Sequence, residues 1–237
     1  MTQTRTNYHA VIKVIGVGGG GVNAVDRMVE AGLGSIEFIA ANTDAQQLLN
    51  SQADVKIDIG RQLTRGLGAG GDPEVGRAAA EEHRLEIEES LKDADMVFIT
   101  AGEGGGTGTG AAPVVAEVAR SLGILTIAIV TRPFGFEGRR RANQAEKGIE
   151  TLRPKVDTMI IIPNDRLGAV ATQNTSLTDA FRIADEVLLS AVRGVTELIT
   201  EPGLINTDFA DVNTVLRNAG TAIMGVGAST GEGRAVN

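Results

Sequence analysis

A glycine-rich segment near the start of the chain has the spacing of a phosphate-binding turn. Gly16, Gly18 and Gly21 form the pattern G-x-G-x-x-G at the end of the apolar run 11–17, and a helical pattern follows at 22–31. Glycines at this spacing let the backbone approach a phosphate, while the N–H groups and the positive end of a helix dipole face it. Dinucleotide oxidoreductases and tight structural turns share the spacing, so all three interpretations stay open at this point.

A second glycine-rich segment, GEGGGTGTG at 102–110, separates the apolar run 96–100 from a helical pattern that begins at Pro113. Two phosphate-binding loops favour a longer phosphate chain, and a triphosphate would fit between two helix N-termini. A third segment, GLGAGG at 66–71, precedes a helix start at Asp72 and Pro73. It either closes over the terminal phosphate through backbone N–H groups or is a simple connector.

The missing residue types exclude several kinds of chemistry. The sequence has no G-x-x-x-x-G-K-[ST] motif, which excludes a Walker-type nucleotide hydrolase. It has no cysteine, and we expect its two histidines, His9 and His83, on the surface away from the motifs. A nicotinamide-dependent oxidoreductase needs an acidic residue after the second strand. The Asn-Thr-Asp segment at 42–44 meets that need only in part, and the second glycine loop stays unexplained.

Short apolar runs rich in β-branched residues predict the strands that carry these loops. They lie at 11–17, 36–41, 55–59, 96–100, 124–130 and 158–162, and helical patterns separate them at 22–31, 74–92, 113–122 and 140–152. The runs lack alternation, which is typical of strands buried on both faces. The sequence therefore predicts an α/β fold with a doubly wound, mostly parallel sheet. Its first and fourth strands would be neighbours, and both glycine loops would meet at one crevice.

The pattern changes at residue 176. Apolar residues recur at steps of three and four from Leu177 to Leu198 behind a Ser176–Asp179 capping box, which predicts one long helix. A short helix at 208–218 follows, and 222–226 resembles the first strand of a new unit. We expect a nucleotide-binding domain at 1–175, a central connecting helix at 176–200, and a loop, short helix and incomplete C-terminal domain at 201–237.

Composition argues against other partners. The 237 residues carry a formal charge of −8, so no overall basic field is present to hold a nucleic acid. No apolar run approaches the ~20 residues that span a bilayer, and the first ten residues lack the apolar segment of a signal peptide. We expect a cytoplasmic protein without direct membrane insertion.

Taken in chain order, the motifs resemble the FtsZ family of bacterial cell-division GTPases, relatives of tubulin. The segments that carry the resemblance are GVGGGGVNAV, GGGTGTG, RPFGFEGRRR, IPNDRL and GLINTDFADV. The resemblance implies a Rossmann-like GTPase domain that binds GTP or GDP and hydrolyses GTP to GDP and phosphate. It also implies head-to-tail self-assembly into filaments at the midcell division ring.

The matching motifs imply a set of GTP-binding residues: Gly19, Gly20, Gly21, Val22, Asn23, Gly71, Gly106, Thr107, Gly108, Glu137, Arg141, Asn164, Phe181 and Asp185. Phe181 would stack on the base, although it also fits the apolar stripe of the long helix. Asp185 would accept hydrogen bonds from guanine N1–H and N2–H₂, which adenine cannot supply. Glu137 and Arg141 would contact the ribose and phosphates.

Asp208 and Asp211 are the candidate catalytic residues. Three positions apart at a helix start, they share one face, where they either orient a water molecule or only cap the helix, which contributes about 0.3–1 kcal/mol. They follow a helix about 36 Å long, which predicts a position at the end of the domain opposite the phosphate loops. The pair would then act on the nucleotide of the next molecule, in a heterologous contact that generates open filaments.

Three further expectations complete the prediction. Mg²⁺ is expected with the nucleotide, because the chain is acidic and lacks the usual phosphate-binding lysine. Division proteins would bind through regions missing here, since the family normally carries a complete second domain and a C-terminal tail. We therefore expect this chain to bind nucleotide but to polymerise and hydrolyse GTP poorly. A homologue that assembles without turnover is the remaining alternative, and would require loss of the aspartate pair.

Overall fold

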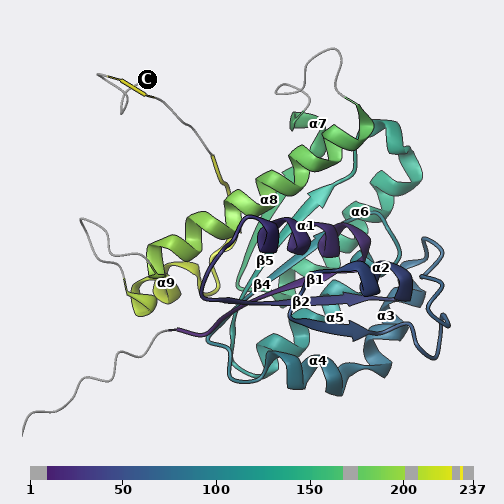
Figure 1. The fold of residues 1–237 in the computed structure, drawn as a ribbon, viewed down its shortest axis with the longest axis horizontal. Helices are drawn as coiled ribbons and strands as arrows, with labels where there is room; N and C mark the ends of the chain where they lie inside the picture. The colour runs from purple at the N-terminus through teal and green to yellow at the C-terminus, as the bar shows by residue number, and fades with distance from the viewer. Residues whose placement is uncertain (1–9, 168–175, 201–207, 226–229, 232–237) are drawn as a thin grey trace, which may run out of the picture.

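The computed structural model describes residues 10–167, 176–200, 208–225 and 230–231. In this part of the chain, seven strands form one sheet in the order β3-β2-β1-β4-β5-β6-β7, and all neighbouring pairs are parallel (Figure 1). The strands are β1 (Ile12–Val17), β2 (Ile36–Asn42), β3 (Val55–Asp58), β4 (Met96–Gly102), β5 (Leu125–Arg132), β6 (Thr158–Pro163) and β7 (Gly220–Ala222). The predicted doubly wound sheet, with β1 beside β4, is confirmed.

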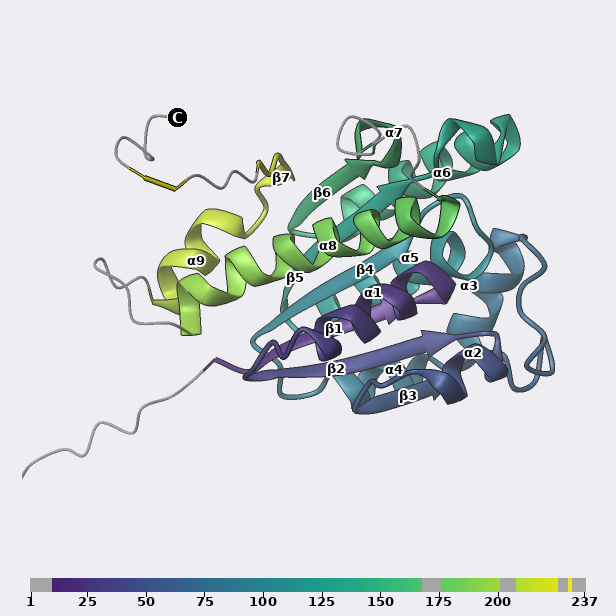
Figure 2. The same ribbon diagram turned by 45° about the horizontal axis from the view of Figure 1, so that its top comes forward.

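Helices cover both faces of this sheet (Figure 2). They are α1 (Gly18–Glu30), α2 (Ala45–Asn50), α3 (Pro73–Glu82), α4 (Arg84–Leu91), α5 (Thr107–Ser121), α6 (Arg139–Leu152), α7 (Asn164–Leu167), α8 (Leu177–Thr200) and α9 (Phe209–Leu216). One apolar core joins the sheet to α1, α2, α8 and α9, and the other joins it to α3, α4, α5 and α6. Successive residues of β1, such as Val14 and Ile15, enter opposite cores, which explains the lack of alternation.

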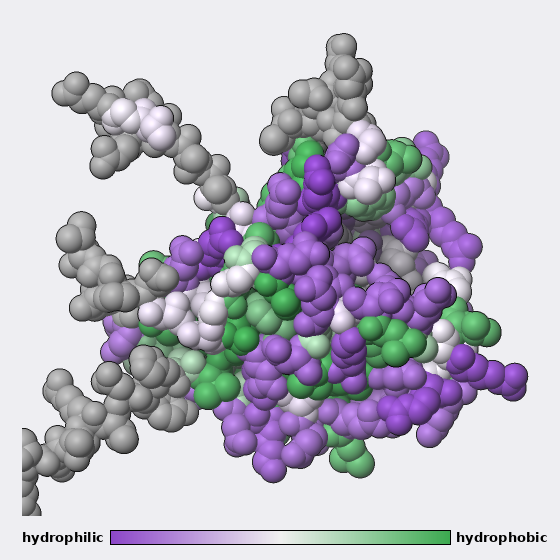
Figure 3. Space-filling view, viewed as in Figure 1, coloured by the Kyte–Doolittle hydropathy of each residue, from purple (hydrophilic) through white to green (hydrophobic). Residues whose placement is uncertain are grey.

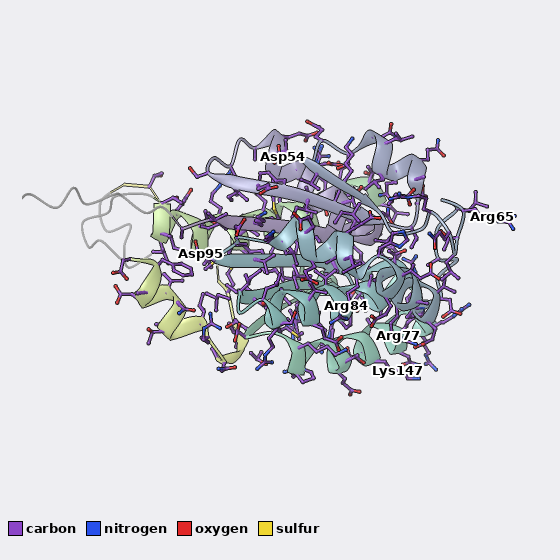
Figure 4. The ribbon with its side chains drawn as sticks, turned by 90° about the horizontal axis from the view of Figure 1, so that it is seen from below. Asp54, Arg65, Arg77, Arg84, Asp95 and Lys147 are labelled. Carbon is purple, nitrogen blue, oxygen red and sulfur yellow. The ribbon has the colours of Figure 1, made fainter. Side chains whose placement is uncertain are left out.

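Aspartates directly before two strands tie the amino ends of neighbouring strands together. Asp54 Oδ2 accepts the Phe38 N–H at 2.9 Å, and Asp95 Oδ2 accepts the Val11 N–H at 2.8 Å. Figure 4 labels both aspartates, and labels Arg65 at the other end of the molecule, in the loop that follows β3. These bonds help to fix the register of the parallel strands, and the carboxyl ends of the strands gather on the side of Arg65.

The predicted helix 74–92 is two helices that meet at His83. This residue has φ −108° and ψ 20°, outside the helical range, and its Nδ1 lies 2.9 Å from the Ala79 carbonyl oxygen. Only 5% of His83 is exposed. Placing His83 on the surface was wrong, because its ring folds back over the last turn of α3. His9 lies outside the described residues.

Other helix starts also differ from the prediction. α5 begins at Thr107 and contains Pro113, and α1 begins at Gly18 rather than at residue 22. Glycine and threonine have low helix propensities, so the sequence pattern did not indicate that α1 and α5 begin within the glycine-rich segments. α9 is shorter than the predicted 208–218, whereas α8 spans nearly the whole of the predicted 176–200.

The last strand joins the existing sheet. Gly220 of β7 pairs with Thr158 of β6, so β7 lies at the edge of the sheet. The strand therefore lies at 220–222 and not at the predicted 222–226, and the start of a second domain in this part of the chain stays a prediction. The division of the chain at 175 and 200 stays a prediction, since residues 168–175 and 201–207 lie outside the described part.

The face carrying α1 and α8 is mostly hydrophilic, with apolar side chains visible between those two helices (Figure 3). Among the described helices, none combines the length and the apolar character that a bilayer crossing requires.

Candidate nucleotide site

A cavity of about 470 Å³ lies where β1, β4, β5 and β6 end. Twelve of the fourteen predicted nucleotide-binding residues line it: Gly19, Gly20, Asn23, Gly71, Gly106, Thr107, Gly108, Glu137, Arg141, Asn164, Phe181 and Asp185. The other two, Gly21 and Val22, are buried in α1 and do not line it. The structure therefore brings residues from six separate segments of the chain to one hollow.

Gly21 has a packing task instead. A Cβ atom on Gly21 would lie 2.3 Å from the Thr100 carbonyl oxygen, and one on Gly16 would lie 2.3 Å from the Gly21 carbonyl oxygen. The first turn of α1 thus presses directly on β1 and β4, which leaves no room for a side chain. Gly16 and Gly21 therefore let the start of α1 lie close to the sheet, and their neighbours Gly19 and Gly20 line the cavity.

We predict that Gly21→Ala lowers the free energy of unfolding by about 1–3 kcal/mol, because the methyl group overlaps backbone atoms that cannot move far. Gly194→Ala is the matched control, since Gly194 is exposed in α8 and a Cβ there meets nothing within 4 Å. It should raise stability by roughly 0.5–1 kcal/mol. Urea denaturation of both variants measures the difference, and equal stability would contradict the packing role.

The second loop meets the first at the cavity. A Cβ on Gly18 would lie 2.6 Å from the Gly108 backbone nitrogen, so α1 and α5 begin side by side. The hydroxyls of Thr107 and Thr43 are 2.6 Å apart, which joins the start of α5 to the segment after β2. Two helix N-termini therefore face the same space, where their dipoles favour an anion. The predicted convergence of the glycine loops is confirmed.

The third glycine segment also reaches this space. Gly71 lines the cavity, and a Cβ on Gly106 would lie 2.9 Å from the Asp72 nitrogen, so the two loops touch. Gly71 has φ +77°, a left-handed conformation that glycine adopts without strain.

At the mouth of the cavity, Arg141 forms an ion pair with Glu137, one helical turn before it. Glu137 Oε1 also accepts the Phe134 N–H at 2.9 Å, which holds this short turn in place. The neighbouring arginines, Arg139 and Arg140, are exposed and do not line the cavity.

Phe181 and Asp185 of α8 and Asn164, directly after β6, also line the cavity, and we call the part of the cavity beside these three residues the slot. Phe181 is 42% exposed and meets the Phe134 ring edge-on at 5.3 Å, so it lies at the rim and not in the core. Asp185 follows one turn later. Burial raises the pKa of Asp185 to about 7, and Arg27 partly opposes this rise. Asn164 is buried, and its Oδ1 has no hydrogen-bond partner among the described residues. The slot thus offers an aromatic face and two polar edges to a planar ligand.

Comparison with known proteins assigns the chain to a family. Residues 11–172 match the family described as Tubulin/FtsZ family, GTPase domain. The chain belongs to the Tubulin/FtsZ family. The resemblance in the sequence motifs is confirmed.

Solved structures of this family have the same fold. An FtsZ dimer from M. jannaschii is 51% identical, with a TM-score of 0.87 over 91% of this chain and 63% of that one. A point mutant of M. jannaschii FtsZ is also 51% identical, with a TM-score of 0.91 over 96% of this chain and 68% of that one. CetZ2 from Haloferax volcanii, solved as a GTPγS-bound protofilament, is 25% identical with a TM-score of 0.77 over 90% and 64%. The chain spans under two thirds of the length of the FtsZ dimer's chain.

Within this FtsZ-family site, Glu103 is a cavity residue that the sequence motifs did not single out, although it lies inside the second glycine loop. Only 4% of Glu103 is exposed, and neither carboxylate oxygen has a hydrogen-bond partner among the described residues. Burial raises the pKa of Glu103 to about 8, and the nearby Thr109 hydroxyl offsets the rise only in part. The side chain is therefore mostly protonated near pH 7, which limits the negative charge beside the phosphate loops.

The oxidoreductase alternative finds no support in the FtsZ-family fold. Asp44, its best candidate for a ribose hydroxyl, accepts the Gln47 N–H at 3.0 Å as the N-cap of α2. It does not line the cavity.

The helix α9, with Asp208 as its N-cap and Asp211 in its first turn, lies at the end of the sheet where the strands begin, away from the cavity at their carboxyl ends (Figures 1 and 2). Asp208 Oδ1 accepts the Asp211 N–H at 2.9 Å, and Asp211 Oδ2 accepts the Asp208 N–H at 3.4 Å. This is a capping box at the start of α9. Both side chains are exposed, so capping leaves carboxylate oxygens open to a neighbour.

Proposed function

We propose that this chain binds GTP and GDP in the 470 Å³ cavity and hydrolyses GTP as part of a head-to-tail filament that serves bacterial cell division at the midcell ring. The observation that carries the proposal is the meeting of α1 and α5 at one cavity that includes a slot for a planar base. Anionic phosphates suit the paired helix starts, and a purine suits the slot beside Phe181.

Base selection follows from the donors of guanine. Its N1–H and N2–H₂ groups both donate, and a carboxylate accepts both. Asp185 supplies the carboxylate, and the unpaired Oδ1 of Asn164 supplies a further acceptor. Adenine lacks the N1–H donor, so it would leave Asp185 desolvated and unpaired. A buried polar group left unpaired rejects a ligand more strongly than the loss of an apolar contact does.

Mg²⁺ is proposed to arrive with the nucleotide. Among the described residues, no group of three or more acidic or histidine side chains gathers to hold a metal ion. Mg²⁺ commonly uses phosphate oxygens and water with one or two protein ligands, so this donor-poor, phosphate-binding cavity fits an ion carried by the ligand. When bound, the ion would offset phosphate charge during transfer to water.

Hydrolysis needs a group that orients water, and we assign that task to Asp208 and Asp211 of the next molecule. Their distance from their own cavity supports action on a neighbouring molecule through a heterologous contact, which produces open filaments. The relatives solved as a dimer and as a protofilament support self-association. Division partners would bind parts of the protein beyond these residues.

Nucleotide binding at pH 8 tests the proposal. The chain should bind GTP and GDP at least about 100-fold more tightly than ATP or NAD, because only guanine satisfies Asp185. Asp185→Asn should lower GTP affinity about tenfold or more and raise affinity for XTP, since an amide presents one donor and one acceptor to xanthine.

Glu186→Gln is the matched control for Asp185→Asn, since Glu186 is exposed beside Asp185 and does not line the cavity. It should lower the affinity for GTP far less than Asp185→Asn does and should not raise the affinity for XTP, because it removes only a negative charge near Asp185 and leaves the base contacts in place. Preference for NAD, or no nucleotide binding by the unmodified chain, would overturn the proposed function.

A further inference from the structure

Gln144, on the inner side of α6, contacts two of the glycine loops at once. Its Nε2 lies 2.9 Å from the Gly105 carbonyl oxygen, 3.2 Å from that of Gly104 and 3.0 Å from that of Gly71. Only the NH₂ end of the side chain suits this position, because three carbonyl oxygens surround it and the amide oxygen would be repelled. One side-chain amide therefore ties the second glycine loop to the third.

These bonds orient the peptide groups of the second loop. In a planar trans peptide, the C=O of one residue and the N–H of the next point in opposite directions. Because the Gly104 and Gly105 carbonyls turn toward Gln144, the N–H groups of Gly105 and Gly106 point away from it. Both of these glycines line the nucleotide cavity.

The preceding amides of the loop behave differently. Glu103 N–H donates to the Thr131 carbonyl oxygen at 3.0 Å, and Gly104 N–H donates to the Thr109 hydroxyl at 2.8 Å. Among the described residues, no protein group accepts from the N–H of Gly105 or Gly106. Successive amides without a protein acceptor at a concave surface bind anions.

We propose that Gln144 is a positioning residue that aims the Gly105 and Gly106 amides at the phosphates of the bound nucleotide. The inference rests on the proposed function for the identity of the ligand. Without the side-chain amide, the Gly104 and Gly105 peptide groups are free to rotate, and Gly104, with φ +99°, has the backbone freedom to let them do so. The contact with Gly71 makes the third loop move together with the second.

Gln144→Glu tests the proposal, because it keeps the shape of the side chain and replaces its only donors with acceptors that repel the three carbonyls. At pH 8 we expect the affinity for GTP and GDP to fall about tenfold or more, as for the loss of oriented amide donors, and the affinity for guanosine to change less than about twofold. Titration calorimetry with GTP, GDP and guanosine gives the three values.

Asn143→Asp is the matched control, since it makes the same amide-to-carboxylate change one residue earlier, at an exposed position outside the cavity. It should leave all three affinities unchanged. Gln144→Lys, which restores donors, should recover part of the phosphate-dependent affinity. An equal loss for guanosine and GTP, or none for GTP, would overturn the role of Gln144. If the unmodified chain fails to bind GTP, the proposed function itself is wrong.

Discussion

In a protein that also carries the second domain normal for the family, Asp211→Asn should bind GTP with unchanged affinity and lose about 100-fold in assembled turnover, the typical contribution of a group that handles the attacking water. Asparagine keeps an acceptor for the capping box at α9, so helix stability changes little. Phosphate release at high protein concentration gives the turnover, and titration with GTP gives the affinity. Unchanged turnover would contradict the catalytic role.

A mixing experiment separates action between molecules from action within one. Asp211→Asn has an intact nucleotide site, and Asp185→Ala has an intact aspartate pair but a damaged base slot. Each is expected to be nearly inactive alone. In an equimolar mixture that assembles head to tail, about a quarter of the contacts join an intact nucleotide site to an intact aspartate pair. Turnover should therefore return to about a quarter of that of the unmodified protein. A mixture as inactive as its components would show that the pair serves its own chain.

Glu103→Gln should stabilise the protein by several kcal/mol above pH 8 and by almost nothing below pH 4.5. The pKa of Glu103 is about 8 in the folded chain against an ordinary value of 4.5. Below pH 4.5 both states are protonated. Between pH 4.5 and pH 8, Glu103 is ionised in the unfolded chain and stays protonated in the folded chain, so the free energy of unfolding falls by about 1.4 kcal/mol per pH unit. Glutamine is neutral at every pH and removes this loss of stability.

Urea denaturation across pH 4–9 measures that effect by comparing the two proteins at each pH. Glu150→Gln is the control, since Glu150 is exposed on α6, and a substitution of this kind usually changes stability by less than about 0.5 kcal/mol. A stability difference between the unmodified chain and Glu103→Gln that stays constant with pH would mean that side-chain shape, and not ionisation, is responsible.

Local patterns were sufficient to predict most of the fold. The apolar runs predicted β1 to β6 because strands buried on both faces need apolar residues at every position. The glycine loops predicted where phosphates would bind, and Ser176 and Asp179 marked the start of α8 through a capping box. Each of these signals arises between residues close in sequence. Motif matching then added Phe181 and Asp185, whose shared cavity with the glycine loops the structure describes.

The sequence by itself determined the family, the positions of β1 to β6 and the glycine segments that line the cavity, because the backbone conformations that these require are encoded by neighbouring residues. The tertiary structure decided which atoms perform each task. It buried His83 and Glu103, set Gly21 against β4, placed β7 on the edge beside β6 and brought Gln144 to three distant carbonyls. Burial and contact between remote segments depend on how the whole chain packs, so no local pattern encodes them.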